Sequence, residues 1–329
     1  MCVLLGRAQH GLNMRTSKGE WLNSWMGEAV NWECDELGHL NMRHYVGKAE
    51  EARQFLFMHL GLSHAFMAGA PSTVRTREVT VCYLGEARPG ARLSIRSGIT
   101  RLGEVDADVV HIMEHADGRR AATIEERVEH IALRTQAAFP WPRRLREAVA
   151  GVRVKAADVG ARGLPDVAFE GPDRDAVIEM GCDRVGAGVF RVAETDVFGM
   201  VRPVSLFGRC SESVGNFTKG WPEAYTEGGL YDAERAGAAR LSGVLLEMKL
   251  VIHKAAKVGQ AFEFRSGLLA VSPATRNLIH HIHDPVGGES YASMVATSAI
   301  MDLEARKLVK SGPDQLAALG QNVLPDVKA

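Results

Sequence analysis

The sequence contains one short signature twice, and this repeat constrains the fold more than any other feature. Residues 33–38, which read ECDELG, return 161 residues later as ETDVFG at 194–199. A second block, residues 90–98, returns 169 residues later and ends both times in Arg-Ser-Gly. Two registers that differ by one short insertion predict two tandem copies of one domain. Further matching pairs are Gly47 with Gly208, Glu51 with Glu212, Glu78 with Glu247, and Gly118 with Gly287.

Composition sets limits on partners and location. The chain has 329 residues, enough for about two domains, with 39 basic and 40 acidic residues. This balance favours neither nucleic acid nor an anionic membrane as a partner. The five cysteines are odd in number and lack C-x-x-C spacing, which indicates reduced thiols. The start of the chain lacks the features of a signal peptide, and no apolar run approaches a membrane span of about 20 residues, so we expect a cytoplasmic protein.

The first copy is expected over residues 20–138, and its clearest element is a helix over residues 41–60. Apolar residues recur there at three- and four-residue spacing. An initial strand is expected before the helix and four strands after it, around residues 79–83, 93–96, 105–113 and 124–133, separated by turn sequences. Such a sheet must cover one apolar face, and the helix is the available cover, so the pattern predicts a sheet wrapped around a helix.

The other segments follow from the repeat. Residues 139–183 have no sustained periodicity and are expected to be a connector, in which Arg143, Arg144 and Arg146 form a solvated face rather than a phosphate site. The second copy is expected over residues 184–308, with a helix that begins near Pro203 and an insertion within 221–243. Residues 309–329 are expected to be a peripheral tail. Residues 1–13 have no counterpart in the second copy, which leaves open whether they belong to the native protein.

A dense local motif surrounds the first signature. Residues 35–45 read DELGHLNMRHY, and residues 50–53 read EEAR. This pattern resembles the 4-hydroxybenzoyl-CoA-type acyl-CoA thioesterases of the hotdog superfamily. The resemblance implies an α+β protein of two tandem hotdog domains, paired as a pseudo-dimer. It also implies hydrolysis of an acyl-CoA to a free acid and coenzyme A, without a cofactor, and a possible homo-oligomer of double-domain chains.

By this resemblance Asp35 is the catalytic carboxylate, acting as the nucleophile or as the general base toward water. A helix N-terminus offers unpaired N–H groups and a partial positive charge, which suit a developing oxyanion. The amide of Met42 is the expected donor. The same field favours an ionised carboxylate at Asp35.

Each motif residue also has a structural interpretation. Asp35 can organise the turn between strand and helix, and Asn41 can be the helix N-cap instead of a catalytic group. His39 can orient Asp35 or water, or it can be a satisfied structural group.

Two further residues, Glu51 and Cys34, lie near the motif. Glu51, like its repeat partner Glu212, fits either a helix charge pair or a second carboxylate facing the site. Cys34 lies beside Asp35, but no base partner for a nucleophilic thiol can be identified.

Metal binding is not expected. Of the clustered histidines His280, His281 and His283, only the last two share a face in strand geometry, and no third ligand is suggested.

The second copy differs from the first at three of the motif residues. At an offset of 161, His39 becomes Met200, Asn41 becomes Arg202 and Met42 becomes Pro203, while Asp35 becomes Asp196. Proline has no N–H to donate, although it starts a helix well. We therefore expect one working site around Asp35 and a degenerate site around Asp196.

Three alternatives remain at this level. Hotdog hydratases and dehydratases combine an aspartate and a histidine with an Asn-Pro-like element that is missing here. Plant-type acyl-carrier-protein thioesterases share the tandem architecture, but their catalytic residues lie in the later copy. A non-catalytic acyl-CoA-binding module would keep the cleft without needing an ionised Asp35. The sequence has no G-x-S-x-G, G-x-G-x-x-G or P-loop motif that would point elsewhere.

Overall fold

A computed structural model describes residues 19–35, 37–155, 159–221, 241–302 and 304–325. The strands are β1 (Leu22–Glu28), β2 (Ser72–Tyr83), β3 (Arg92–Leu102), β4 (Asp106–His115), β5 (Arg120–Ala132), β6 (Asp183–Val189), β7 (Leu241–Ile252), β8 (Ala261–Val271), β9 (Arg276–His283), β10 (Ser290–Asp302) and β11 (Lys307–Val309). The α-helices are α1 (Met42–His59), α2 (Arg143–Ala148), α3 (Arg174–Glu179), α4 (Pro203–Ser213) and α5 (Pro313–Gly320). Short 3-10 helices are η1 (Asn31–Glu33), η2 (Val149–Gly151), η3 (Val192–Glu194) and η4 (Val214–Asn216).

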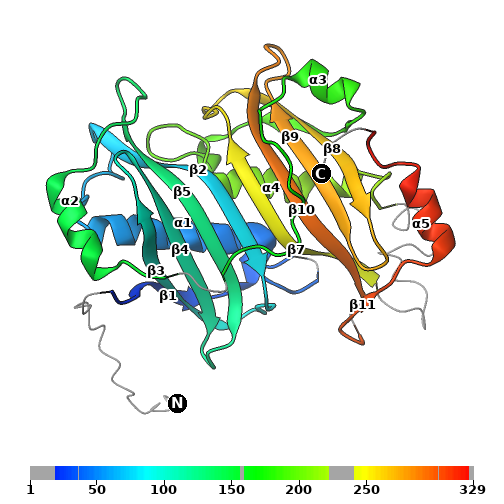
Figure 1. The fold of residues 1–329 in the computed structure, drawn as a ribbon, viewed down its shortest axis with the longest axis horizontal. Coiled ribbons are helices and arrows are strands. Elements are labelled where there is room, and N and C mark those ends of the chain that lie inside the picture. Colours follow the sequence, from blue (N-terminus) through cyan, green and yellow to red (C-terminus); the bar gives the residue numbers. More distant parts are fainter. Residues whose placement is uncertain (1–18, 36, 156–158, 222–240, 303, 326–329) are drawn as a thin grey trace.

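The strands form one continuous antiparallel sheet across both copies (Figure 1). Its order is β1-β3-β4-β5-β2-β7-β10-β9-β8-β6, with β11 paired to β10. The two halves meet where β2 pairs with β7, from Glu78 opposite Val251 to Cys82 opposite Glu247. Each half therefore contributes one edge to a shared centre, and the strand order of one half mirrors that of the other.

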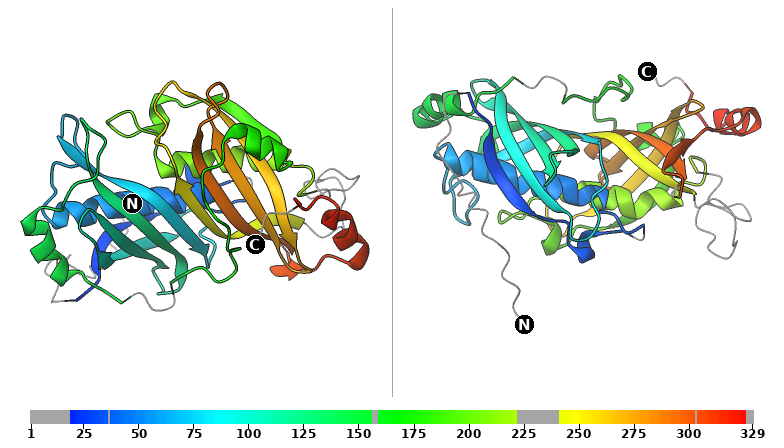
Figure 2. Two further views of the ribbon diagram at one scale, coloured as in Figure 1. Left: turned by 45° about the horizontal axis from the view of Figure 1, so that its top comes forward. Right: turned by 90° about the horizontal axis from the view of Figure 1, so that it is seen from below.

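Each half is curved around one helix, and Figure 2 shows α1 and α4 in a row on the same face of the sheet, one under each half. The tandem hotdog fold and the α+β class are thereby confirmed. Helix α1 lies within one residue of the predicted range at each end, and every strand expected in the first copy is present. Most of these strands are longer than predicted because alternation is clear only over their central residues.

Strand registers confirm both offsets of the repeat. Leu22 of β1 lies opposite Ser97 of β3, and Asp183 of β6 lies opposite Ser266 of β8. These pairs are related by the 161- and 169-residue offsets. Both pairings then shift register at the equivalent point, so even the irregularity is duplicated.

One predicted pair is off by a residue. Gly118 has a positive φ of 85°, and the second-copy glycine with this conformation is Gly288, at 75°, rather than Gly287. The turn between β9 and β10 is thus one residue longer than its counterpart.

The repeated glycines of the helices mark the place where the copies touch. A Cβ added to Gly47 would lie 3.2 Å from Val204 Cγ2, and one added to Gly208 would lie 2.7 Å from an Arg43 guanidinium nitrogen. Each helix thus presents a glycine to the other, which allows α1 and α4 to approach closely.

The repeated Arg-Ser-Gly block also has a packing explanation. A Cβ at Gly98 would lie 2.4 Å from Val154 Cγ2, and one at Gly267 would lie 2.4 Å from Leu324 Cδ1. After each copy the chain returns across the outer face of the sheet, with isolated parallel bridges of Ile99 to Arg153 and of Leu268 to Val323. The glycines leave room for this crossing strand.

These crossings correct the predicted boundaries. Helices α2 and α5 lie at opposite ends of the molecule in Figure 1 and precede equivalent crossings, so the repeat includes residues 143–153 and 313–323. The tail is not peripheral, because Leu319 of α5 is fully buried. The equivalence of residues 143–153 and 313–323 could not be predicted from the sequence, because the two segments are alike in burial and not in residue identity. Most of the expected insertion at 221–243 lies outside the described residues.

The connector runs over the outer face of the sheet and contacts both copies. The hydroxyls of Thr123 and Thr297 donate to the carbonyls of Val159 and Gly163, at 2.8 and 2.7 Å. Within the described residues, no helix combines the length and apolar character that spanning a membrane requires.

Substituting Gly98 tests this packing. Gly98→Ala forces a methyl group against Val154, and overpacking of this kind costs about 1–3 kcal/mol. Urea unfolding should show this loss, with Gly320→Ala as the control, because a Cβ at Gly320, the last residue of α5, meets nothing within 4 Å. Equal stability of the two variants would contradict the proposed role of the glycine.

Candidate active site between the two copies

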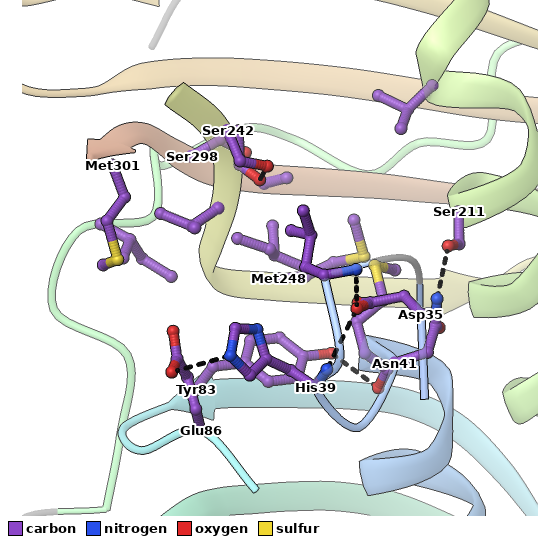
Figure 3. A pocket seen from close by; sticks show the side chains of 18 of the residues that line it. Asp35, His39, Asn41, Tyr83, Glu86, Ser211, Ser242, Met248, Ser298 and Met301 are labelled. Atoms are coloured by element: carbon purple, nitrogen blue, oxygen red, sulfur yellow. Dashed lines mark hydrogen bonds and ion pairs between the residues drawn. The ribbon is translucent and has the colours of Figure 1, made fainter. Parts of the chain in front are cut away.

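The first motif opens onto a cavity of about 860 Å³ that both copies line. Copy 1 contributes the loop before α1, the start of α1 and the end of β2, while copy 2 contributes α4 and strands β7, β9 and β10. Among the predicted site residues, the cavity is lined by Asp35, His39, Asn41 and Met42. The structure therefore brings these four together, at the junction of the copies (Figure 3).

Asp35 organises the turn that precedes α1. Its Oδ1 accepts hydrogen bonds from the backbone N–H groups of Leu37, at 3.0 Å, and His39, at 3.3 Å. Asp196 does the same for Phe198 and Met200, at 2.9 and 3.0 Å. The turn role is thus common to both copies, and any difference in chemistry must come from what surrounds each aspartate.

Asn41 caps α1 and also contacts the other copy. Its Oδ1 accepts from the N–H of Arg43 at 3.1 Å, and its Nδ2 donates to Ser211 Oγ of α4 at 3.0 Å. The Met42 N–H, first in the helix, makes no hydrogen bond within the described part of the chain. An open amide at a helix N-terminus thus borders the cavity.

Two tyrosines hold this helix end in place, namely Tyr45 of the motif and Tyr83, which the sequence analysis did not single out. The Tyr83 hydroxyl donates to the Met42 carbonyl at 3.2 Å, and the Tyr45 hydroxyl donates to the Gly85 carbonyl at 3.2 Å. Their rings meet edge to face at 5.3 Å. Burial raises the pKa of Tyr45 to about 12, so its hydroxyl stays protonated and acts as a fixed donor.

His39 belongs to an ionic cluster across the copies. Its Nε2 lies 3.2 Å from a Glu86 carboxylate oxygen, and Glu86 also pairs with Arg306 of copy 2. Burial, helped by Arg306, lowers the pKa of His39 against the opposing effect of Asp35. A neutral His39 at pH 7 can donate to Glu86 or accept a proton. Glu86 and Arg306 were missed because no local signature distinguishes them from other surface charges.

Glu51 lies outside the cavity. Its carboxylate accepts from Trp25 Nε1 at 3.0 Å, while Glu212 pairs with Arg209 at 2.8 Å on its own helix. The geometry therefore does not support the prediction of Glu51 as a second carboxylate of the site. The preceding residue, Glu50, is the one that contacts the other copy, through Val204 and Arg202.

Around the second motif, Glu50 of copy 1 lies against the N-terminus of α4. Val204, which follows the helix-starting Pro203, donates its N–H to Glu50 Oε1 at 2.7 Å, and Arg202 Nε lies 3.3 Å from Oε2. Burial raises the pKa of Glu50 to about 7, although Arg53, Arg202 and the Val204 N–H oppose the rise. A protein carboxyl thus occupies the N-terminus of α4.

The space beyond Glu50 is filled by a buried ionic group. Arg53 pairs with Glu126 and donates to Thr76, and His111 Nε2 lies 3.3 Å from Glu126 Oε1. Although burial alone would raise it, the pKa of Glu126 is lowered to about 2 by Arg53 and His111. The cavity at this motif measures only about 270 Å³.

The corresponding positions on the other side carry smaller side chains. By the offsets of the repeat and the strand registers, Ser211 replaces Glu50, Val214 replaces Arg53 and Ala296 replaces Glu126. All three line the large cavity. The difference in volume between the two sites therefore follows from these replacements together with the shorter helix α4.

The remaining candidates have structural contacts. Burial, with Asp35 and Glu33 nearby, raises the pKa of the Cys34 thiol, which keeps it protonated. His281 Nδ1 lies 2.9 Å from Ser293 Oγ, and His283 Nε2 lies 2.9 Å from the Pro172 carbonyl. Among the described residues, no group of three His, Cys, Asp or Glu side chains is arranged to hold a metal ion.

Comparison with known proteins supports the resemblance at the level of the superfamily. Residues 30–149 match the model of the thioesterase-like superfamily, a stretch that contains the first motif. No curated protein matches the chain. Neither finding singles out the 4-hydroxybenzoyl-CoA-type family.

Solved structures confirm the double fold at low sequence identity. An acyl-ACP thioesterase from Bacteroides thetaiotaomicron has a TM-score of 0.58 at 11% identity, covering 83% of this chain and 96% of its own. An oleoyl thioesterase from Lactobacillus plantarum gives 0.61 at 14%, covering 88% and 98%. The 12:0-ACP thioesterase of Umbellularia californica gives 0.62 at 11%, covering 83% and 92%. At these identities the likeness establishes the fold.

The raised pKa of Glu50 predicts a specific pH dependence of stability. Folding moves the pKa of this carboxyl from 4.5 to about 7, so its contribution is most favourable in acid and is lost as the pH rises between these values. The loss amounts to about 3 kcal/mol. Glutamine does not titrate and escapes this loss. Between pH 4.5 and 7.5 the free energy of unfolding of Glu50→Gln should therefore rise by about 3 kcal/mol relative to that of the parent.

Urea unfolding at a series of pH values measures this difference. Glu51→Gln, an exposed glutamate in the same helix turn, is the control for the loss of one carboxylate from this helix. If the free energies of unfolding of Glu50→Gln and the parent change in parallel with pH, the description of a buried Glu50 at the N-terminus of α4 is contradicted.

Proposed function

We propose that the protein hydrolyses an acyl thioester to a free acid and a thiol at the cavity around Asp35. The observation that carries this proposal is the asymmetry of the two motifs. One combines a carboxylate, an open helix amide and a cavity of about 860 Å³, whereas the other has the same aspartate with its helix end closed by Glu50. The superfamily match over the first copy agrees with this chemistry.

In the proposed reaction the thioester oxygen receives the Met42 N–H and the partial positive charge of the α1 N-terminus. In one route a water molecule attacks the carbonyl carbon and gives its proton to Asp35, and the carbon–sulfur bond then breaks. In the other, Asp35 attacks the carbonyl carbon, the carbon–sulfur bond breaks to leave an acyl–aspartyl anhydride, and water hydrolyses that anhydride. In both routes the thiolate leaves and is protonated. Tyr83 holds Met42 for this role, and Asn41 links the helix end to copy 2.

Glu50 provides an internal guide to where the substrate carbonyl binds. Its carboxylate accepts the N–H of Val204, the second residue of α4. At the corresponding end of α1, where the Met42 N–H is open, the oxygen of an acyl group would bind in a similar way. By the repeat, the side chain that faces the α1 N-terminus from the other copy is Ser211, which is small and leaves that position accessible.

The thiol carrier is either coenzyme A or an acyl carrier protein. The tandem neighbours from Bacteroides thetaiotaomicron and Umbellularia californica are named as ACP thioesterases. We retain acyl-CoA as the proposed substrate, as the motif suggests, and include both carriers in the assay.

A non-catalytic acyl-CoA-binding module is the second candidate, and one observation favours it. The Asp35 carboxylate makes the same turn bonds as Asp196, which lies at the closed site. A binding module would need only this turn and the cavity, so the two functions differ in whether Asp35 is needed for turnover.

Paired substitutions at the two aspartates separate these functions. Asp35→Asn keeps an oxygen for the turn but removes the base or nucleophile, so CoA release should fall about 100-fold or more. Asp196→Asn is the matched control, since it alters the same turn in the other copy, and its activity should stay near that of the parent. The assay is thiol release from a panel of acyl-CoA and acyl-ACP substrates.

Two results would contradict the assignment. Loss of activity on changing Asp196, with Asp35→Asn still active, would move the site to the second motif. An inactive parent that binds acyl-CoA, with the same affinity in Asp35→Asn, would identify a binding module.

Ser211→Glu should reproduce the closed site at the open one. The new carboxylate would face the N-terminus of α1 as Glu50 faces that of α4, and displacing the substrate oxygen should lower kcat/KM about 100-fold or more. Ser211→Ala, which loses only the contact with Asn41, should fall by less than about tenfold. Full activity in Ser211→Glu, with the fold verified by circular dichroism, would refute this placement of the carbonyl.

A further inference from the structure

Three histidines of copy 2 lie on the outer face of the sheet, opposite the cavity. Leu278 lines the cavity from β9, so alternation along this strand places His281 and His283 on the other face. Their side chains are buried, at 2% and 0% exposure, and their ring centres are 5.9 Å apart. His253 follows the end of β7. We call these three residues the histidine cluster, and the proposed reaction makes no use of it.

The connector covers the histidine cluster. His283 Nε2 donates to the Pro172 carbonyl at 2.9 Å. A Cβ added to Gly171 would lie 2.9 Å from His253 Cγ. Figure 1 shows the connector, in green, crossing the sheet before it reaches α3. The backbone of the connector therefore lies directly against two of the three imidazole rings.

Ser293 of β10 joins the rings of His253 and His281. Its hydroxyl oxygen lies 2.9 Å from His253 Nε2 and 2.9 Å from His281 Nδ1. A hydroxyl has a single proton, so Ser293 donates to one ring and accepts from the N–H of the other. The hydrogen bonds of the cluster thus suit neutral imidazoles, each of which carries one proton.

The charged form of the cluster would leave buried protons without acceptors. A charged imidazole carries a proton on both nitrogens. Among the described residues, neither His281 Nε2 nor His283 Nδ1 has a hydrogen-bond partner, and both atoms are buried. Charging either ring therefore leaves a buried donor unpaired, and two charged rings at this spacing would repel each other.

The charged groups beside His283 largely cancel one another. Glu263 of β8 and Asp173 of the connector favour its charged form, and Arg265 of β8 opposes them. Glu263 is itself paired with three arginines, namely Arg174, Arg184 and Arg265. Burial therefore dominates, and it lowers the pKa of His283.

Burial also lowers the pKa of the other two rings. The pKa of His281 falls to about 3, helped by the neighbouring histidines. The pKa of His253 is lowered by burial with help from His283 and from Arg77 of β2. Lys249 of β7 adds a further cation on this face, with its Nζ 5.2 Å from the ring centre of Phe169 in the connector. The neutral cluster is thus the form that holds the connector at pH 7.

Copy 1 holds the chain on its outer face in a different way. By the offset of 169 and the strand registers, Ile112 takes the place of His281. Ile112 packs with Val154 and Val159. This contact is apolar, so its strength does not change as histidines titrate, whereas the contact in copy 2 is built on histidines.

We propose that the histidine cluster is an acid-sensitive latch, which holds residues 164–174 of the connector on copy 2 at neutral pH and releases them in acid. Buried histidines that take up protons near pH 5–6 change protein contacts in this way. Once released, the rings have an ordinary pKa of about 6.5. The closed latch is therefore most stable above pH 6.5 and loses stability as the pH falls below this value. This inference does not depend on the proposed function.

Hydrogen–deuterium exchange of the parent protein at pH 7.5 and 5.5, corrected for intrinsic exchange rates, measures the opening of residues 164–174. One histidine with a pKa of 6.5 in the open state and about 3 in the closed state increases opening about tenfold over this range. The expected increase is therefore about tenfold or more. Residues 149–154, which cross the outer face of copy 1, are the internal control and should change by less than about twofold.

Variants assign the response to the cluster. His281→Gln has no group that titrates in this range and can still donate to Ser293, so it should lower the increase about tenfold relative to the parent. His59→Gln is the control, because it makes the same change at an exposed histidine in the last turn of α1, and it should keep the parent response.

Three results would overturn the latch. One is an unchanged opening of residues 164–174 in the parent at pH 5.5. Another is an equal increase in residues 149–154 and 164–174, which would indicate opening of the whole protein. The third is an undiminished increase in His281→Gln. The first two come from the parent alone, so the test stands even if the variant folds poorly.

Discussion

The pairing of β2 with β7 is the constraint on which the rest of the structure depends. It joins two half-sheets edge to edge and sets α1 against α4 on one face. Each motif then lies at the end of one helix and opens toward the other copy. Consequently neither copy lines its cavity alone, and the side chain that faces each helix N-terminus comes from the opposite helix. Gly47 and Gly208 allow the close approach that this arrangement needs.

Duplication within one chain frees the two sites to diverge, which a symmetric homodimer could not do. Around Asp196 the space contains Glu50 and the buried group of Arg53, Glu126 and His111. Charged side chains are retained in an interior only when they are paired, and breaking such a pair is costly. The paired charges therefore make the region around Asp196 a rigid part of the interface between the copies. The other half carries small or apolar residues at the same positions and keeps the cavity on which the proposed reaction relies.

Much of the fold and part of the site followed from the sequence. The two repeat offsets reappear in the strand registers, and the periodicity of α1 predicted both of its ends to within one residue. Pro203 distinguished the second motif from the first, because proline has no N–H. The partners across the copies could not be predicted. Ser211 and Glu50 reach their motifs from far along the chain, and helix periodicity alone does not tell which of Glu50 and Glu51 faces inward. The segments at 143–153 and 313–323 share only burial, so no residue pattern revealed their equivalence.

The central claim is that the chain has one open acyl site, built by both copies, and one site that its own carboxyl closes. The most direct test is the stoichiometry of a non-hydrolysable thioether analogue of acyl-CoA, measured by calorimetry on the unmodified protein. We predict one molecule bound per chain. Two molecules per chain would contradict the closed second site, and the absence of binding in a folded protein would contradict the open first one.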